Sequence, residues 1–126
     1  MKKTLLTDGA PKAQHILSQG LAVGNTVYVS GQVHVKPDNS LVVGTVAEKI
    51  DQIMNNIKAI LSEAGAGLDD IVKVVVYVTD MSIMPELNEA YPNYFSVPFP
   101  VREAVCVKEL PLGADIEISV IASVEN

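Results

Sequence analysis

An apolar segment in the middle of the chain most constrains how it can fold. Residues 71–79 read IVKVVVYVT, a composition typical of a β-strand. On a regular strand, one face would carry Val72, Val74, Val76 and Val78, and the other Ile71, Val75 and Tyr77. Because both faces are apolar, we expect this strand to lie in a sheet that is covered on both sides.

Alternating apolar residues predict further strands on either side of this segment. Runs 16–23 and 26–33 flank Gly24-Asn25, a pair suited to a two-residue hairpin turn. A short strand over 41–43 follows the turn-forming residues 37–40. Two final strands are expected over 102–109 and 116–124, joined by a turn at 110–113.

Two helices are expected between the strands. Thr45 and Glu48 have the spacing of a capping box, and apolar residues then recur every three or four positions up to Leu61. This first helix should end near Ala64, before Gly65. A second helix over 83–91 should end or kink at Pro92.

These elements predict a single α+β domain over residues 1–126, with two helices on one face of a mixed, mostly antiparallel sheet. The two helices can cover only one face of that sheet. Val75 and Tyr77 on the other face would remain exposed unless a second copy of the chain covered them. We therefore expect an oligomer.

The composition excludes several partners. The net charge is −6, and Arg102 is the one arginine among nine basic residues, so nucleic acid is an unfavourable partner. A single cysteine rules out an intrachain disulfide. The chain has no export signal and no apolar run of the roughly 20 residues that span a bilayer. We expect a cytoplasmic protein without a membrane partner.

Arg102 is the first candidate binding residue. On a regular strand it shares a face with Ala104, Cys106 and Lys108, while Val105 and Val107 would face the core. A guanidinium group beside small residues can hold a carboxylate through two hydrogen bonds. A surface or interface ion pair explains the same pattern equally well.

Glu117 is the second candidate. It lies opposite the core face of the last strand, which consists of Ile116, Ile118, Val120 and Ala122. If the last two strands pair as a hairpin, Glu117 shares a sheet face with Arg102. There it could be the ion-pair partner of Arg102 or a carboxylate that activates water, and the spacing does not decide between them.

The remaining reactive side chains favour structural roles. Nothing near Cys106 in the sequence would lower its pKa, so we expect a buried, inert thiol. His15 and His34 lie on opposite arms of the predicted hairpin and could in principle share a metal ion, but they lack the spacing of a metal site. We expect ordinary surface or edge histidines and no metal.

Five blocks in the same order resemble the RidA/YjgF family of imine deaminases, also labelled L-PSP endoribonucleases. They are Val27–Gln32, Leu68–Val74 with Val78–Met81, Asn88–Tyr91, Pro100–Arg102, and Leu110-Pro111 with Ile116–Ile118. The resemblance covers nearly the whole chain.

The resemblance implies a chorismate-mutase-like homotrimer with a central barrel, helices outside and a cleft between each pair of subunits. It also implies hydrolysis of 2-iminoacids to 2-oxoacids and ammonia, without a metal or cofactor. In this family, the residue matching Arg102 binds the substrate carboxylate and the residue matching Glu117 holds the attacking water. Residues matching Ser30, Gly31 and Asn88 line the cleft from the neighbouring subunit.

Two cleft residues depart from the family pattern. Leu17 replaces a tyrosine that contacts substrate or water, and Ala104 stands where many members have cysteine. The leading functional hypothesis is an imine deaminase. A non-catalytic protein that binds small carboxylates or 2-oxoacids in the same cleft is the alternative, while a ribonuclease fits poorly with the acidic composition.

Overall fold

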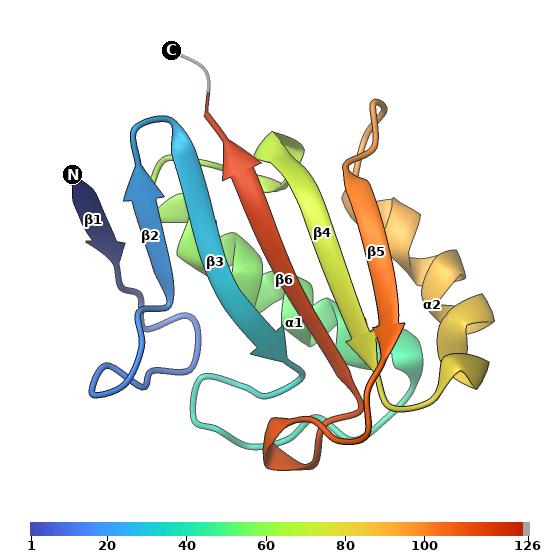
Figure 1. The fold of residues 1–126 in the computed structure, drawn as a ribbon. Coiled ribbons are helices and arrows are strands. Elements are labelled where there is room, and N and C mark those ends of the chain that lie inside the picture. Colours follow the sequence, from blue (N-terminus) through green and yellow to red (C-terminus); the bar gives the residue numbers. More distant parts are fainter. Residues whose placement is uncertain (125–126) are drawn as a thin grey trace.

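The computed structural model of the protein describes residues 1–124 and contains a six-stranded mixed sheet with two α-helices packed on it (Figure 1). The elements are β1 (Lys2–Leu5), β2 (Gly20–Val23), β3 (Thr26–Val33), α1 (Val46–Ser62), β4 (Ile71–Val78), α2 (Met84–Ala90), β5 (Val101–Cys106) and β6 (Ile116–Ser123). Short 3-10 helices cover Leu68–Asp70, Met81–Ile83, Tyr91–Tyr94 and Pro111–Gly113.

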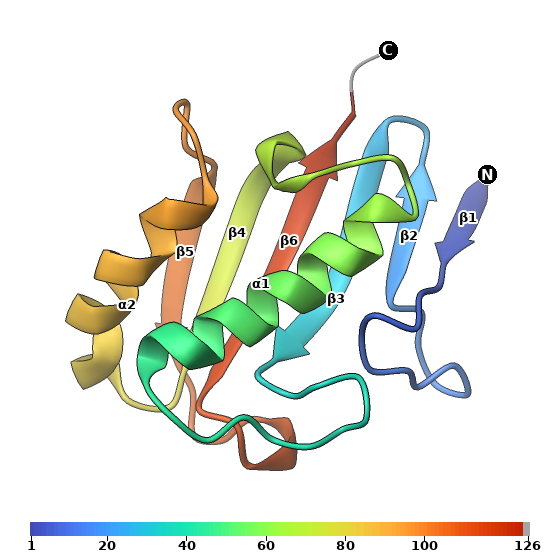
Figure 2. The same ribbon diagram turned by 180° about the vertical axis from the view of Figure 1, so that it is seen from behind.

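The helices form a single layer. Figure 2 shows α1 and α2 lying across the same face of the sheet. No helix within residues 1–124 covers the opposite face, which we call the open face. The predicted α+β class, with two helices on one face of a mixed sheet, is therefore confirmed.

The strand order is β1-β2-β3-β6-β4-β5. Neighbouring strands are antiparallel except β4 and β5, which are parallel. The last two strands do not pair as a hairpin, because β6 inserts between β3 and β4 while β5 forms the sheet edge. The chain returns from β4 to β5 through α2, since a parallel pair needs a long crossover.

The first helix confirms its predicted cap. The Thr45 hydroxyl accepts a hydrogen bond from the Glu48 amide at 3.1 Å, and the Glu48 carboxylate accepts one from the Thr45 amide at 2.9 Å. The helix buries Ile50, Ile53, Ile57 and Ile60 against the sheet. It ends before Gly65, whose φ of 70° lies in the left-handed region that glycine tolerates.

Strand β4 confirms the predicted core residues Val74, Val76 and Val78, which are completely buried. A bulge at its start inserts one extra residue opposite β6, between Ile71 and Lys73. Ile71 is consequently buried while Val72 is 48% exposed, so the prediction exchanged the faces of these two residues.

Other boundaries also differ from the sequence prediction. Strand β1 was not predicted, and β2 begins at Gly20 because the amides of Ile16 and Leu17 both bond to Ala13 in a turn. The predicted strand at 41–43 is reduced to one bridge between Val35 and Leu41. The second α-helix ends at Ala90, close to the predicted break, and β5 ends at Cys106.

No helix within residues 1–124 is long and apolar enough to cross a bilayer.

Candidate active site

A bulge in β3 shapes the first part of the site. Val29 pairs with Val120 and Gln32 with Ile118, so β3 holds one residue more than β6 between these two pairs. Ser30 and Gly31 occupy the bulge. The Ser30 amide instead donates to the Gln19 carbonyl at 2.9 Å, and its hydroxyl donates to the Ser18 carbonyl at 2.6 Å. The bulge thus joins β3 to the loop that carries Leu17.

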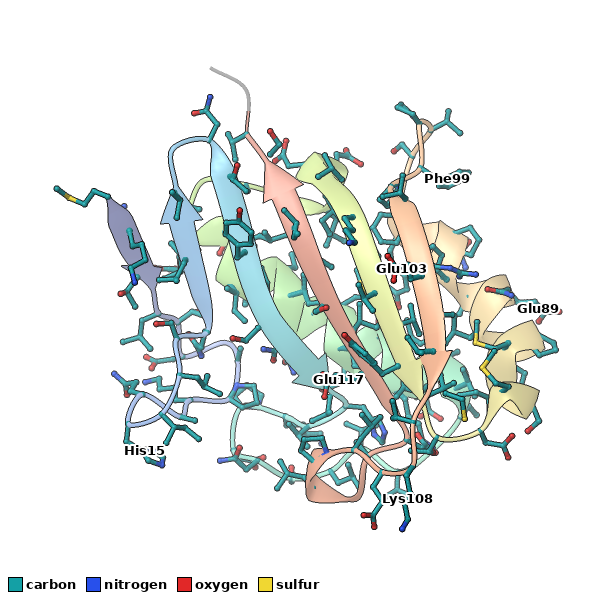
Figure 3. The ribbon with its side chains drawn as sticks, in the orientation of Figure 1. His15, Glu89, Phe99, Glu103, Lys108 and Glu117 are labelled. Carbon is teal, nitrogen blue, oxygen red and sulfur yellow. The ribbon has the colours of Figure 1, made fainter. Side chains whose placement is uncertain are left out.

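Glu117 lies against this bulge. It pairs with Val33 in the β3–β6 ladder and projects from the open face near the lower end of β3 (Figure 3). A β-carbon added to Gly31 would lie only 2.9 Å from Glu117 Cδ, so the carboxylate occupies space that a glycine leaves free. Partial burial raises the pKa of Glu117, because the charged form loses hydration.

The carboxylate opens into a pocket of about 420 Å³. The pocket also contains three other residues singled out from the sequence, namely Leu17, Ser30 and Gly31. Its remaining wall is mainly apolar and includes Ile16, Val33, Val35, Pro111 and Leu112. A carboxylate of raised pKa in an apolar pocket is well placed to exchange a proton with a bound water molecule.

Arg102 belongs to a second group of residues, between β5 and α2. Its Nη1 donates to Asn88 Oδ1 at 2.8 Å, and its guanidinium carbon lies 4.8 Å from the centre of the Tyr91 ring. Ala104 follows on the same face of β5 and contacts the core. An arginine held by an amide oxygen and an aromatic face keeps its remaining N–H groups available to a carboxylate.

The structure does not bring Arg102 and Glu117 together within one chain. Arg102 pairs with Val74 and points toward the helices, whereas Glu117 pairs with Tyr77 and points to the open face. The two residues were expected to share a sheet face only if the last two strands formed a hairpin, and that condition is not met. Asn88, which the resemblance grouped with Ser30 and Gly31, lies beside Arg102 instead.

The alternation of β5 was also misread. Val105 is 42% exposed on the open face, while Ala104 is turned toward the helices, so the predicted valine core face is wrong. Cys106 is exposed rather than buried. Within the described residues β5 is an edge strand with one neighbouring strand, so its side chains are more accessible than those of the central strands.

His34 is a structural residue that the sequence did not reveal. It is 2% exposed, rather than a surface or edge histidine; its Nδ1 donates to the Val42 carbonyl at 2.9 Å and its Nε2 accepts from the Asp115 amide at 3.0 Å. Asp115 Oδ1 lies 3.0 Å from the same nitrogen but has no hydrogen to accept from it. His34 thereby joins the end of β3 to the residue before β6.

Lys49 completes this cluster from α1. Its ammonium group bonds to Asp115 Oδ2 at 2.8 Å. Burial by itself would raise the pKa of Asp115, but its polar neighbours, Lys49 foremost through a hydrogen bond and its charge, hold that pKa below its ordinary value. Residues 1–124 contain no group of three or more His, Cys, Asp or Glu side chains that could hold a metal ion.

Tyr91 is the other residue that the sequence analysis missed. It lies three positions after Asn88, and residues at this spacing share one face of a helix. That spacing was a usable signal, because it places an aromatic ring beside the amide that meets Arg102.

Comparison with known proteins identifies the family. The profile of the family described as Endoribonuclease L-PSP matches residues 7–124. The crystal structure of RidA from an Antarctic Psychrobacter superposes with a TM-score of 0.91 and 42% identity, covering 97% of this chain and 99% of that one. The chain belongs to the RidA/YjgF family.

Members of the RidA family that resemble this chain have different names. Protein MMF1, mitochondrial, from Saccharomyces cerevisiae is 44% identical over 93% of this chain and 81% of its own length. The 2-iminobutanoate/2-iminopropanoate deaminase of Dermatophagoides farinae is 36% identical over 98% of both chains.

Proposed function

We propose that this protein hydrolyses 2-iminoacids to 2-oxoacids and ammonia. The observation that carries the proposal is Glu117, a half-buried carboxylate of raised pKa that is held against Gly31 in an apolar pocket. Relatedness to a protein named as an imine deaminase supports the same reaction.

The reaction needs Arg102 and Glu117 in one site, so the site must be shared between subunits. In a single sheet, the backbones of β5 and β6 lie about 10 Å apart with β4 between them, and the two side chains diverge. We therefore assign Arg102 to one subunit and Glu117 to the next, in a homotrimer whose open faces form a central barrel. Tyr28, Val75 and Tyr77 on the open face would then be covered.

In this site, each group has one task. Arg102 binds the substrate carboxylate, and Asn88 with Tyr91 holds the guanidinium in place. Ionised Glu117 accepts a proton from water as the water oxygen attacks C2 of the iminium, forming a carbinolamine. Glu117 then returns the proton to nitrogen; the C–N bond breaks and ammonia leaves, while the hydroxyl proton is lost as the 2-oxoacid carbonyl forms.

The test is a coupled assay in which an amino-acid dehydratase generates the imine and semicarbazide traps what the protein has not hydrolysed. Wild-type protein should lower the amount of trapped imine. Arg102→Lys keeps the charge but loses the planar fork, so both turnover and 2-oxoacid binding should fall. Glu117→Gln should keep 2-oxoacid binding while turnover falls by roughly 10²- to 10⁴-fold.

A protein that binds carboxylates without turnover is the second candidate, and the position of Leu17 on the pocket wall favours it. Leucine offers no hydroxyl to orient a water molecule. Wild-type protein that binds 2-oxoacids but hydrolyses imines no faster than buffer would establish this alternative. Restoring a hydroxyl with Leu17→Tyr should raise turnover of 2-iminobutanoate if the deaminase proposal is right.

A further inference from the structure

The pocket beside Glu117 is larger and more apolar than a three-carbon iminoacid requires. Its volume of about 420 Å³ lies within the range of pockets that enclose drug-sized ligands. Apolar residues come to it from three separate segments: the loop before β2, the region after β3 and the turn before β6. They include Ile16, Leu17, Val35, Pro111 and Leu112.

The polar side chains on the wall are largely occupied by the protein itself. Gln19 accepts from the Thr7 amide and donates to the carbonyls of Thr7, Ala10 and Pro11. The Ser30 hydroxyl donates to the Ser18 carbonyl, and Gln32 donates to the Ser30 carbonyl. Lys12 pairs with Asp8. What remains for a ligand is mostly apolar surface around the Glu117 carboxylate.

Two leucines line the pocket with side chains that are largely exposed and contribute little to the core of a single chain. Leu17 is 46% exposed and Leu112 is 62% exposed. Leu112 also adopts φ 62° and ψ 19°, a left-handed conformation that a residue with a side chain rarely takes. Such strain persists where the surrounding structure enforces it, and it is concentrated at ligand sites.

We propose that Leu17 and Leu112 determine specificity for 2-iminoacids with long aliphatic side chains, which they contact in this pocket. The inference rests on the proposed deaminase function and names its substrate class. The C=N group lies at Glu117 and the substrate carboxylate on Arg102 of the neighbouring subunit, while the side chain extends along the apolar wall. Each added methylene should raise kcat/KM about fourfold, as expected for moving one CH₂ group from water to an apolar site.

The test compares 2-iminopropanoate, 2-iminobutanoate, 2-iminopentanoate and 2-iminohexanoate, each generated by an amino-acid oxidase and assayed by competition with semicarbazide. The six-carbon substrate should exceed the three-carbon one by about 60-fold in kcat/KM. Leu17→Ser and Leu112→Ser should each reduce this ratio several-fold. Val43→Ser is the matched control, because Val43 is 84% exposed and does not line this pocket.

A second readout does not depend on turnover. In the Glu117→Gln variant, calorimetry should show 2-oxohexanoate binding more tightly than pyruvate, and Leu17→Ser in that background should reduce the difference. Hydrolysis of all four imines at similar rates, or with a preference for the smallest, would overturn this inference and leave the deaminase proposal intact. Affinity that rises with chain length without any hydrolysis would overturn the deaminase proposal and retain the apolar subsite.

Discussion

Arg102 and Glu117 lie on opposite faces of the same sheet, with β4 between their strands. Arg102 points toward α2, where Asn88 holds it, and Glu117 points to the open face. No side-chain rotation can bring the two groups together through the sheet. A site that uses both requires two copies of the chain.

Mixing two inactive variants should therefore restore activity. In a random mixture of Arg102→Lys and Glu117→Gln subunits, about a quarter of the shared sites receive the wild-type residue from each neighbour. Purification of co-expressed variants through two different affinity tags keeps only mixed trimers, in each of which one of the three sites is complete, so these should recover about a third of wild-type turnover. Recovery no greater than the sum of the two separate variants would contradict a shared site.

The mass of the assembly is a separate prediction. Light scattering should give about three times the chain mass of 13.5 kDa. A stable monomer would contradict both the trimer and the shared site.

Gly31→Ala should displace Glu117 and reduce turnover by at least tenfold, because the new methyl group would meet the carboxylate. The effect on stability should be modest, since the clash is relieved by movement of one half-buried side chain. Gly67→Ala is the matched control, because a β-carbon at Gly67 meets no atom within 4 Å. Equal turnover in the two variants would show that turnover does not depend on the position of the Glu117 carboxylate.

The acidic limb of the pH–rate profile should reflect Glu117. Burial raises its pKa above the ordinary value of 4.5, and the carboxylate must be ionised to accept a proton from water. The kcat/KM for a 2-iminoacid, corrected for hydrolysis in buffer, should therefore rise with pH through an apparent pKa above 4.5. If the residual activity of Glu117→Gln keeps the same acidic limb, the limb belongs to a group other than Glu117.

The sequence predicted what depends on local periodicity. The cap at Thr45, the buried face of α1 and the alternation of β6 follow from residues that are close together in the chain. Strand pairing is different, because it depends on contacts between distant segments. The turn at residues 110–113 looks like a hairpin turn, yet β6 enters the sheet on the far side of β4 from β5.

The candidate site was predictable only in part for the same reason. Leu17, Ser30, Gly31 and Glu117 do meet in one pocket. The face of Arg102 was misassigned because β5 carries small or apolar side chains on both faces, so alternation does not distinguish them. The contact of Arg102 with Asn88 depends on how α2 crosses from β4 to β5, and the residues of β5 alone do not predict that path.

His34→Ala should lower the free energy of unfolding by about 2–4 kcal/mol, because it leaves a cavity and two backbone groups without a partner. Those groups are the Val42 carbonyl and the Asp115 amide. His15→Ala, at an exposed position, should change stability by no more than about 0.5 kcal/mol. Urea unfolding at one fixed protein concentration measures both, and similar midpoints would argue against the structural role of His34.

Strand β6 is synthesised after the other five strands of the described sheet, yet it lies between β3 and β4. Until residues 116–123 have left the ribosome, β3 and β4 each lack one of their two neighbouring strands, so each exposes an unpaired apolar edge. Contacts between such distant segments also form slowly. The sheet is therefore expected to assemble in a single late step after translation of this segment, and the nascent chain to depend on protection from aggregation until then.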